Sequence, residues 1–233
     1  RAALGAAESL SGPSGLTGQI RLGAPDGCAN YLLPQVLAGI CDANPGLEVQ
    51  VVALPRVFNL SKREADMAIG VSRPVTGRLT VQRLADYRLH LAASRTYLER
   101  NPVPDREALV RHRFVGYIPD LIFDKELDYL AEINAPPVTF SSNSVSVQLN
   151  FLRQGAGLGV VHDFALPAAP ELLRVLPDEP DLFPVWPVEI TLTRTFWLTR
   201  HIDDGRVQRL SRFAEALIRA ARAEMARLEA ACP

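Results

Sequence analysis

Several residues that could bind a small molecule stand where predicted strands and helices meet. Pro25-Asp26-Gly27-Cys28-Ala29 is the expected turn from a first strand into a first helix. Free backbone N–H groups at a helix start attract anions, so Asp26, Gly27 and Cys28 could line a cleft and hold a polar group. Asp26 could equally be the N-cap of its own helix. It would then supply negative charge itself, and a ligand carboxylate would bind better elsewhere.

A second polar cluster, Ser141-Ser-Asn-Ser144, precedes a helix expected at 145–154. Its hydroxyl and amide groups could form a cradle for an anionic or hydroxylated ligand, and we assign Ser142, Asn143 and Ser144 to the candidate site. Serine and asparagine are also good helix caps, so a purely structural role is the alternative.

Further polar side chains follow strands at their carboxyl ends, the edge where α/β sheets bind ligands. Arg56 and Arg73 could each pair with a ligand carboxylate through a forked guanidinium, although a solvated surface arginine is the more common outcome. His162-Asp163 follows a strand expected around 160–161. His162 could make a site pH-responsive, but a hydrogen-bonded structural histidine is the more common case.

No pattern typical of catalysis or metal binding is present. Gly155-x-Gly157-x-Gly159 lies after a helix and before a strand, the reverse of a dinucleotide fingerprint. The motifs G-x-S-x-G and H-E-x-x-H are missing, and the four histidines are scattered. The three cysteines lack C-x-x-C spacing, which argues against a zinc site or a disulfide framework. We therefore expect no enzyme activity, no cofactor and no metal.

Composition and charge argue against direct contact with DNA or a membrane. The 233 residues carry a net charge of −1, without the basic stripe that contact with DNA phosphates requires. No run of about 18 apolar residues predicts a membrane span. The unpatterned cysteines fit a reducing cytosol. An alanine-rich start followed by Ser-Gly-Pro-Ser-Gly predicts that residues 1–17 are the end of a helix and a linker within a longer protein.

Strand and helix patterns alternate along the chain. The opening predicts strands at 19–23, 47–54 and 65–70 with a helix at 28–43, and the chain closes with an amphipathic helix at about 205–230. Its apolar stripe is expected to hold Val207, Leu210, Phe213, Leu217 and Ile218.

Two long strand patterns, 87–94 and 188–198, flank the middle of the chain. If both cross between lobes, the result is an α/β fold of two Rossmann-like lobes joined by two crossing strands. Lobe I would comprise 18–88 plus 194–233 and lobe II 89–193, with a ligand cleft between them.

Several segments, in this order, resemble the LysR-type transcriptional regulator family. They are Gly18-Gln-Ile-Arg-Leu-Gly23, Tyr31-Leu-Leu-Pro34, Asn44-Pro-Gly-Leu-Glu-Val49, Leu60-Ser-Lys-Arg-Glu-Ala-Asp-Met-Ala-Ile69 and Gln154-Gly-Ala-Gly-Leu-Gly-Val160. Together they cover roughly residues 18–220. Two positions depart from the family: Asp163-Phe164 stands where a proline is usual, and Gly70 where an arginine often follows. Pocket chemistry is therefore not copied from better-known members.

The resemblance implies a type 2 periplasmic-binding-protein-like fold whose cleft binds a small effector, an organic acid or an aromatic compound. By family position, Ser141–Ser144 start the helix that faces the cleft from the second lobe. The resemblance also implies a homodimer in which helix 29–43 meets helix 145–154 of the partner, and a tetramer for the full-length protein. DNA would be bound only through an absent N-terminal winged helix-turn-helix, in the cytoplasm and without a membrane.

Two alternatives accompany this interpretation. A redox-sensing variant of the family has its reactive cysteines in the second lobe, whereas this chain has none between residues 42 and 231, so we expect Cys28 to be a small buried residue. A free-standing solute-binding protein of a transporter would share the fold and the cleft. The lack of a signal peptide pattern and the cysteine usage argue against that second alternative.

Overall fold

A computed structural model describes residues 15–53, 64–175 and 191–231 of the chain. Within these ranges the strands form one nine-stranded mixed sheet in the order β2-β1-β3-β9-β4-β7-β5-β6, with β8 paired to β4 beside this path. The strands are β1 (Gly18–Ala24), β2 (Leu47–Ala53), β3 (Met67–Gly70), β4 (Leu79–Ser94), β5 (Phe114–Gly116), β6 (Phe140–Ser141), β7 (Leu158–His162), β8 (Leu172–Arg174) and β9 (Thr191–His201).

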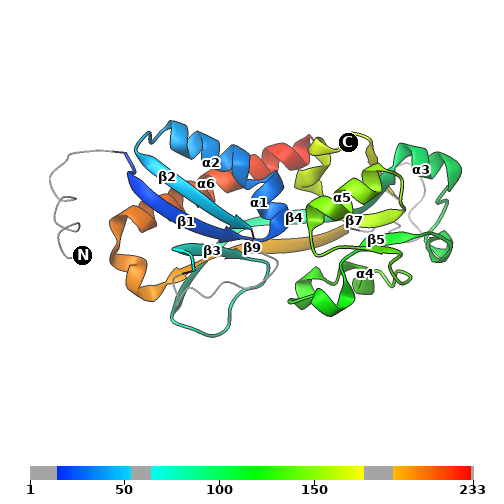
Figure 1. Cartoon of the computed structure of the whole chain (residues 1–233), viewed down its shortest axis with the longest axis horizontal. Coiled ribbons are helices and arrows are strands. Elements are labelled where there is room, and N and C mark those ends of the chain that lie inside the picture. The colour runs from blue at the N-terminus through cyan, green and yellow to red at the C-terminus, as the bar shows by residue number, and fades with distance from the viewer. Residues whose placement is uncertain (1–14, 54–63, 176–190, 232–233) are drawn as a thin grey trace, which may run out of the picture.

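Helices cover both halves of the sheet. The α-helices are α1 (Asp26–Tyr31), α2 (Leu33–Asp42), α3 (Arg95–Arg100), α4 (Tyr129–Glu132), α5 (Val145–Arg153) and α6 (Gln208–Ala230). Short 3₁₀ helices span Glu107–Arg111, Pro119–Leu121, Lys125–Leu127, Asp163–Ala168 and Ile202–Arg206. In Figure 1, α1, α2 and α6 lie over one half, and α3, α4 and α5 surround the other.

Two long strands join the halves. β4 and β9 pair antiparallel from Leu79 opposite His201 to His90 opposite Thr191. On one side β1 pairs parallel with β2 and β3, and on the other β5 pairs parallel with β6 and β7. The expected arrangement, two parallel α/β lobes joined by two crossing strands, is confirmed; because both lobes share β4 and β9, the sheet is continuous. The lobe boundaries 18–88 plus 194–233 and 89–193 cut within these shared strands and remain our proposal.

The first helix and both crossing strands differ from the sequence-based expectation. β9 continues to His201 instead of ending at 198, and residues 188–190 of the predicted strand lie outside the described ranges. The helix expected at 28–43 is two helices, α1 and α2, with Leu32 between them. Pro34 explains the break, because it stands in the first turn of α2 and its ring excludes a continuous helix through the preceding turn. β4 begins at Leu79 rather than near residue 87. A register shift between Arg83 and Ala85 interrupts its alternation, which hides the first part of the strand from pattern analysis.

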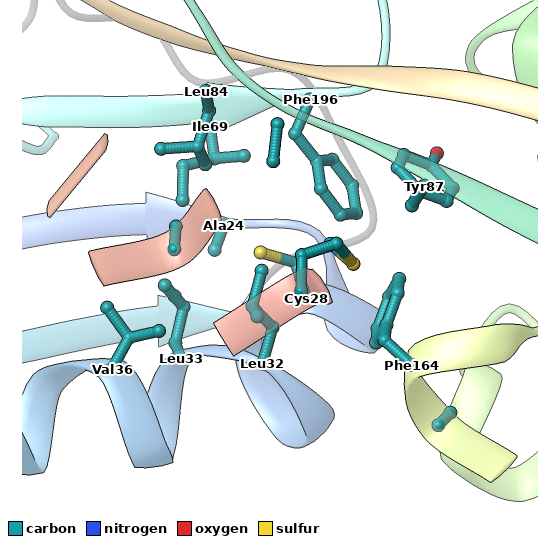
Figure 2. Packing of buried hydrophobic residues seen from close by; sticks show 14 of the residues in the cluster. Ala24, Cys28, Leu32, Leu33, Val36, Ile69, Leu84, Tyr87, Phe164 and Phe196 are labelled. Atoms are coloured by element: carbon teal, nitrogen blue, oxygen red, sulfur yellow. The ribbon is translucent and has the colours of Figure 1, made fainter. Parts of the chain in front are cut away.

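The core extends through both halves of the sheet. On α6, Leu210, Phe213 and Leu217 are buried as predicted, whereas Val207 lies just before the helix and is exposed. Tyr87 and Phe196 stack between the crossing strands with ring centroids 4.1 Å apart. Cys28 of lobe I and Phe164 of lobe II lie around this pair, so the lobes are packed against each other through apolar contacts (Figure 2).

The glycine turn after α5 is closely packed against the backbone of lobe II. A Cβ added at Gly157 would lie 2.3 Å from the carbonyl oxygen of Arg113, which is backbone and cannot move aside. We expect Gly157→Ala to lower the free energy of unfolding by about 2 kcal/mol in urea denaturation. Gly39→Ala is the matched control, because Gly39 lies within α2 and a Cβ there meets nothing within 4 Å. It should raise stability by about 0.5–1 kcal/mol. Equal effects of the two substitutions would contradict the packing.

Candidate functional site

The starts of α1 and α5 meet at the seam between the lobes. Asp26 is the first residue of α1, whose N-cap is Pro25 without a side-chain hydrogen bond. Asp26 Oδ2 instead accepts hydrogen bonds from Ser144 Oγ and from the backbone N–H of Ser146, both at 3.1 Å. The alternative that Asp26 caps its own helix is therefore wrong. Its carboxylate instead accepts the backbone N–H of Ser146 in the first turn of α5, at the positive end of that helix dipole.

Gly27 and Cys28 pack inside this seam. A Cβ added at Gly27 would lie 3.4 Å from the methyl groups of Val145 on α5. Cys28 has no exposed surface, and burial raises the pKa of its thiol well above the ordinary value. A buried, protonated thiol is a poor nucleophile. Cys28 is thus the small buried residue expected from the sequence.

The serine cluster before α5 is hydrogen-bonded within the protein. Ser144 is the N-cap of α5, because its Oγ accepts a hydrogen bond from the Val147 N–H at 3.4 Å. Ser142 Oγ accepts from the Ser144 N–H at 3.1 Å, and the Ser142 carbonyl accepts from Gln148 Nε2 at 2.7 Å. Asn143 is exposed. The cluster therefore fixes the start of α5 and holds Asp26 against it.

His162 ends β7 in an aromatic environment. Its ring stacks on Tyr87 at 5.5 Å and meets Tyr129 edge to face at 5.9 Å between centroids. The Tyr129 hydroxyl lies 3.5 Å from Nε2, and Nδ1 has no hydrogen-bond partner among the described residues. Burial lowers the pKa of His162 to about 4, against the opposing charge of Asp163. The imidazole is therefore neutral at physiological pH.

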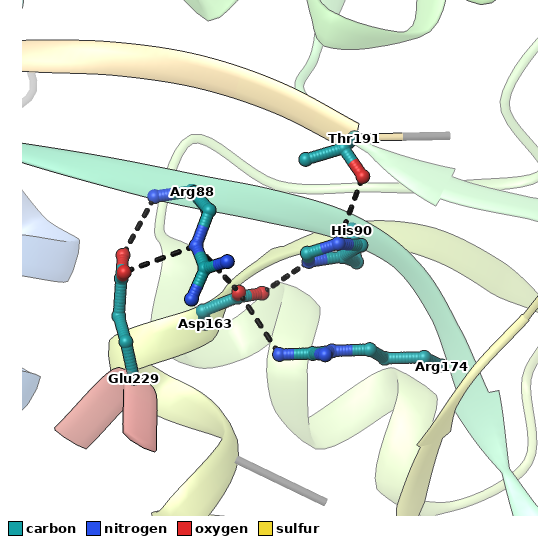
Figure 3. Close-up of polar contacts among 6 residues, drawn as sticks. All are labelled: Arg88, His90, Asp163, Arg174, Thr191 and Glu229. Carbon is teal, nitrogen blue, oxygen red and sulfur yellow. Dashed lines mark hydrogen bonds and ion pairs between the residues drawn. The ribbon is translucent and has the colours of Figure 1, made fainter. Parts of the chain in front are cut away.

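Asp163, the next residue, lies in a separate buried network (Figure 3). Its Oδ1 lies 2.6 Å from His90 Nδ1, and its Oδ2 accepts from Arg174 Nη2 at 3.1 Å, with Arg88 Nε at 3.8 Å. Arg88 also pairs with Glu229 near the end of α6 at 3.1 Å. This network ties β4, β8, α6 and the 3₁₀ helix Asp163–Ala168 together, so the contacts of Asp163 are structural.

Of the two predicted arginines, only Arg73 lies in the described part of the chain. The Arg73 guanidinium lies over the Trp197 ring, 5.6 Å from its centroid, and the residue is exposed. Arg56 lies outside the described residues. Of the predicted site residues, the structure brings Asp26, Gly27 and Ser144 together at the α1–α5 contact.

A cavity of about 600 Å³ lies on the lobe II side of the seam. Among the described residues, it is lined by the end of β5, by side chains of 117–138, and by Gln148 and Val160. Apolar side chains (Tyr117, Ile122, Phe123 and Leu127) share its wall with charged ones (Asp124, Lys125 and Asp128). A second cavity of about 10 Å³, room for about one water molecule, shares Val115, Tyr129, Gln148 and Val160 with the first and is also lined by His162.

Comparison with known proteins identifies the family. Residues 13–222 match the family model described as the LysR substrate binding domain. The chain belongs to this family. Its fold is accordingly the type 2 periplasmic-binding-protein-like α/β fold, and the chain is the effector-binding domain of a LysR-type regulator. The comparisons give no support to the transporter alternative.

Individual relatives agree with this assignment. This LysR-type domain is 28% identical over 200 residues to the HTH-type transcriptional regulator DgdR of Burkholderia cepacia. The aligned residues cover 77% of this chain and 58% of the relative. The regulatory domain of CrgA, a LysR-type transcriptional regulator from Neisseria meningitidis, superposes with a TM-score of 0.71 at 20% identity, covering 87% of this chain and 98% of that one. The Corynebacterium glutamicum OxyR C206 mutant gives 0.67 at 18% identity, covering 94% and 69%.

The cavity of this LysR-type domain was missed by sequence analysis. Tyr117 follows β5 at its carboxyl end, the same rule that selected Arg73, so it could have been found. Ile122, Phe123 and Leu127 come from a segment of short helical turns without a clear period, which gave no signal. Within the described ranges, no group of three His, Cys, Asp or Glu could hold a metal, and no helix has the length and apolarity to cross a membrane.

The burial of His162 predicts a pH dependence of stability. Because the unfolded chain binds a proton near pH 6.5 and the folded domain only near pH 4, stability rises with pH across this interval. At pH 5 the fold should lose about 2 kcal/mol through this residue relative to pH 7.5. Urea midpoints of the wild type and of His162→Phe, measured at both pH values, test this, since the variant should show a correspondingly smaller loss. Identical losses in both proteins would contradict it.

Proposed function

We propose that this domain senses a small organic effector in the cavity on the lobe II side of the seam, and that the longer protein converts binding into transcriptional control. The observation that supports this proposal is the position of the cavity. The cavity is lined by Asp124, whose carboxylate accepts a hydrogen bond from Ser72 Oγ of lobe I, so one of its wall residues takes part in a contact between the lobes. A ligand there could favour one angle between the lobes by its differential affinity for the two states.

The rest of the mechanism is proposed for the whole protein, since the chain spans 58% of the curated relative. DNA would be bound by an N-terminal winged helix-turn-helix, and a rotation between lobes would change the spacing of two such domains on their operator. We place the protein in the cytoplasm, as a homodimer that becomes a tetramer at full length. We expect the domain to perform no catalysis.

A thermal-shift screen tests the cavity as the effector site. Small carboxylates, aromatics, alcohols and amino acids are screened against the wild type, Ala135→Phe and Ala223→Phe. Ala135 lines the cavity, whereas Ala223 lies on the exposed face of α6. Ligands that raise the melting temperature of the wild type and of Ala223→Phe, but not of Ala135→Phe, are expected. Equal shifts in all three proteins would place the ligand elsewhere.

The dimer proposal uses the surface of α2 and α5. Within the seam, α1 already contacts α5 of the same chain, so the partner would meet the outer faces. α2 exposes small residues, Ala38 and Gly39, and α5 exposes Val147. Sedimentation at high concentration should show a dimer that Ala38→Arg weakens. A wild-type domain that stays monomeric would contradict the proposal.

A further inference from the structure

The α5 helix start, which the sequence suggested as an anion site, already holds a carboxylate. Asp26 Oδ2 accepts both the Ser144 hydroxyl and the Ser146 N–H, so these donors are occupied by the protein itself. A ligand carboxylate would have to displace Asp26 and would then lie close to its negative charge. Two like charges a few ångströms apart in a partly buried site repel each other, which disfavours that displacement.

The cavity wall also disfavours an anion. Asp124 and Asp128 line it with one lysine, Lys125, and no arginine lines it in the described part of the chain. Asp124 is held in place by the Ser72 hydroxyl and by the N–H of Glu126. A carboxylate is usually recognised by a forked arginine or by free N–H groups, and here those means are missing or occupied.

A neutral polar group, His162, lines the small cavity next to the large one. His162 is only 4% exposed, and its Nδ1 has no hydrogen-bond partner within the described ranges. It lines the small cavity that shares four wall residues with the large one. A buried nitrogen without a partner is costly, so a water molecule or a ligand group of similar size is stabilised beside it. Because the imidazole is neutral, it matches a hydroxyl or carbonyl group rather than a charge.

We propose that the ligand is an uncharged molecule with an apolar body and one hydroxyl-sized polar group that lies beside His162. Organic acids are rejected by Asp26 at the start of α5 and by Asp124 and Asp128 in the cavity wall. This inference rests on the proposed function, in which the cavity holds the effector. The apolar body would lie against Tyr117, Ile122 and Phe123 in the larger cavity. Its polar end would pass between Tyr129 and Gln148 into the smaller one. His162 is then the residue that sets specificity, and Asp26 blocks the α5 helix start, where an acid would otherwise find free donors.

Matched probe pairs test the ligand class. The probes are benzyl alcohol with benzoate, 2-phenylethanol with phenylacetate, and 2-naphthol with 2-naphthoate, each titrated calorimetrically into the wild-type domain at pH 7.5. At least one uncharged member should bind, with its acid at least about tenfold weaker. His162→Phe should weaken the uncharged probe about tenfold, and His162→Gln, which retains polar atoms, should recover part of the affinity. Asp26→Asn should strengthen the acid.

The outcomes separate this inference from the proposed function. Acids that bind the wild type as tightly as their uncharged partners overturn the ligand class, and so does the failure of every uncharged probe to bind. If an acid binds and Ala135→Phe abolishes its binding, the cavity remains the effector site and only the ligand class is wrong. Binding that is unaffected by Ala135→Phe overturns the proposed function as well. Melting curves of each variant establish that it is folded before titration.

Discussion

Replacing Asp163 with asparagine is expected to lower the free energy of unfolding by about 3 kcal/mol. The carboxylate has no exposed surface and contacts His90 Nδ1 at 2.6 Å and Arg174 Nη2 at 3.1 Å. Asparagine keeps the shape but removes the charge that these donors face. Loss of one partner of a buried ion pair leaves the other uncompensated. We place the effect at the lower end of the usual range because the Arg174 and Arg88 side chains are 23% and 47% exposed.

Asp86→Asn is the matched control for this substitution. Asp86 also lies on β4, one of the two crossing strands, and pairs with Arg83, but its side chain is 40% exposed. Surface ion pairs contribute little, so the control should change stability by less than about 1 kcal/mol. Urea denaturation measures both, and an unchanged slope with a lower midpoint identifies a loss of stability. A loss of the same small size for both variants would mean that the network around Asp163 does not stabilise the fold.

Phe196→Ala is expected to cost about 4 kcal/mol, the largest effect of any single truncation proposed here. Phe196 lies on β9, is 1% exposed, and stacks on Tyr87 of β4 with an angle of 23° between the ring planes. Figure 2 shows the ring between residues of both lobes, so its removal leaves a cavity that neither lobe alone can close. The cost of such a cavity adds to the lost transfer free energy.

The comparison for Phe196 is Phe123→Ala. Phe123 is a phenylalanine of lobe II that is 37% exposed and lines the cavity proposed as the effector site. Its truncation should cost less than about 1 kcal/mol in stability while weakening ligand binding. Chemical denaturation monitored by circular dichroism distinguishes the two. If both truncations cost the same, the seam between the crossing strands is not the centre of the core.

The sequence predicted the elements better than the site. α5 was placed within a residue of its ends because Ser144 is a good cap and Gly155, with a φ of +73°, ends the helix in a conformation that suits glycine. Of the polar residues predicted to bind a ligand, Asp26 and Ser144 contact each other where α1 and α5 begin. What local patterns could not show is that Asp26 binds the start of the opposite helix, because that contact joins residues 118 positions apart.

His162 and Asp163 illustrate the same limit. Adjacent in sequence, they end β7 and begin a 3₁₀ helix, and their side chains point into different surroundings. The His162 side chain packs among aromatic rings and lines the small cavity. The Asp163 carboxylate instead contacts the His90 and Arg174 side chains. Sequence position identified the strand end correctly, but the environment of each side chain depends on residues of β4, α4 and β8 that lie far away in the chain.

The pairing of β4 with β9 bears on how such domains can change over time. The chain enters lobe II along β4 and leaves it along β9, and at that point His90 lies opposite Thr191. A stretch whose two ends are neighbours can be altered, lengthened or exchanged while the remainder keeps its own packing. The cavity wall, which among the described residues is carried on that stretch, is thus free to diversify while α6 and the first three strands conserve the scaffold.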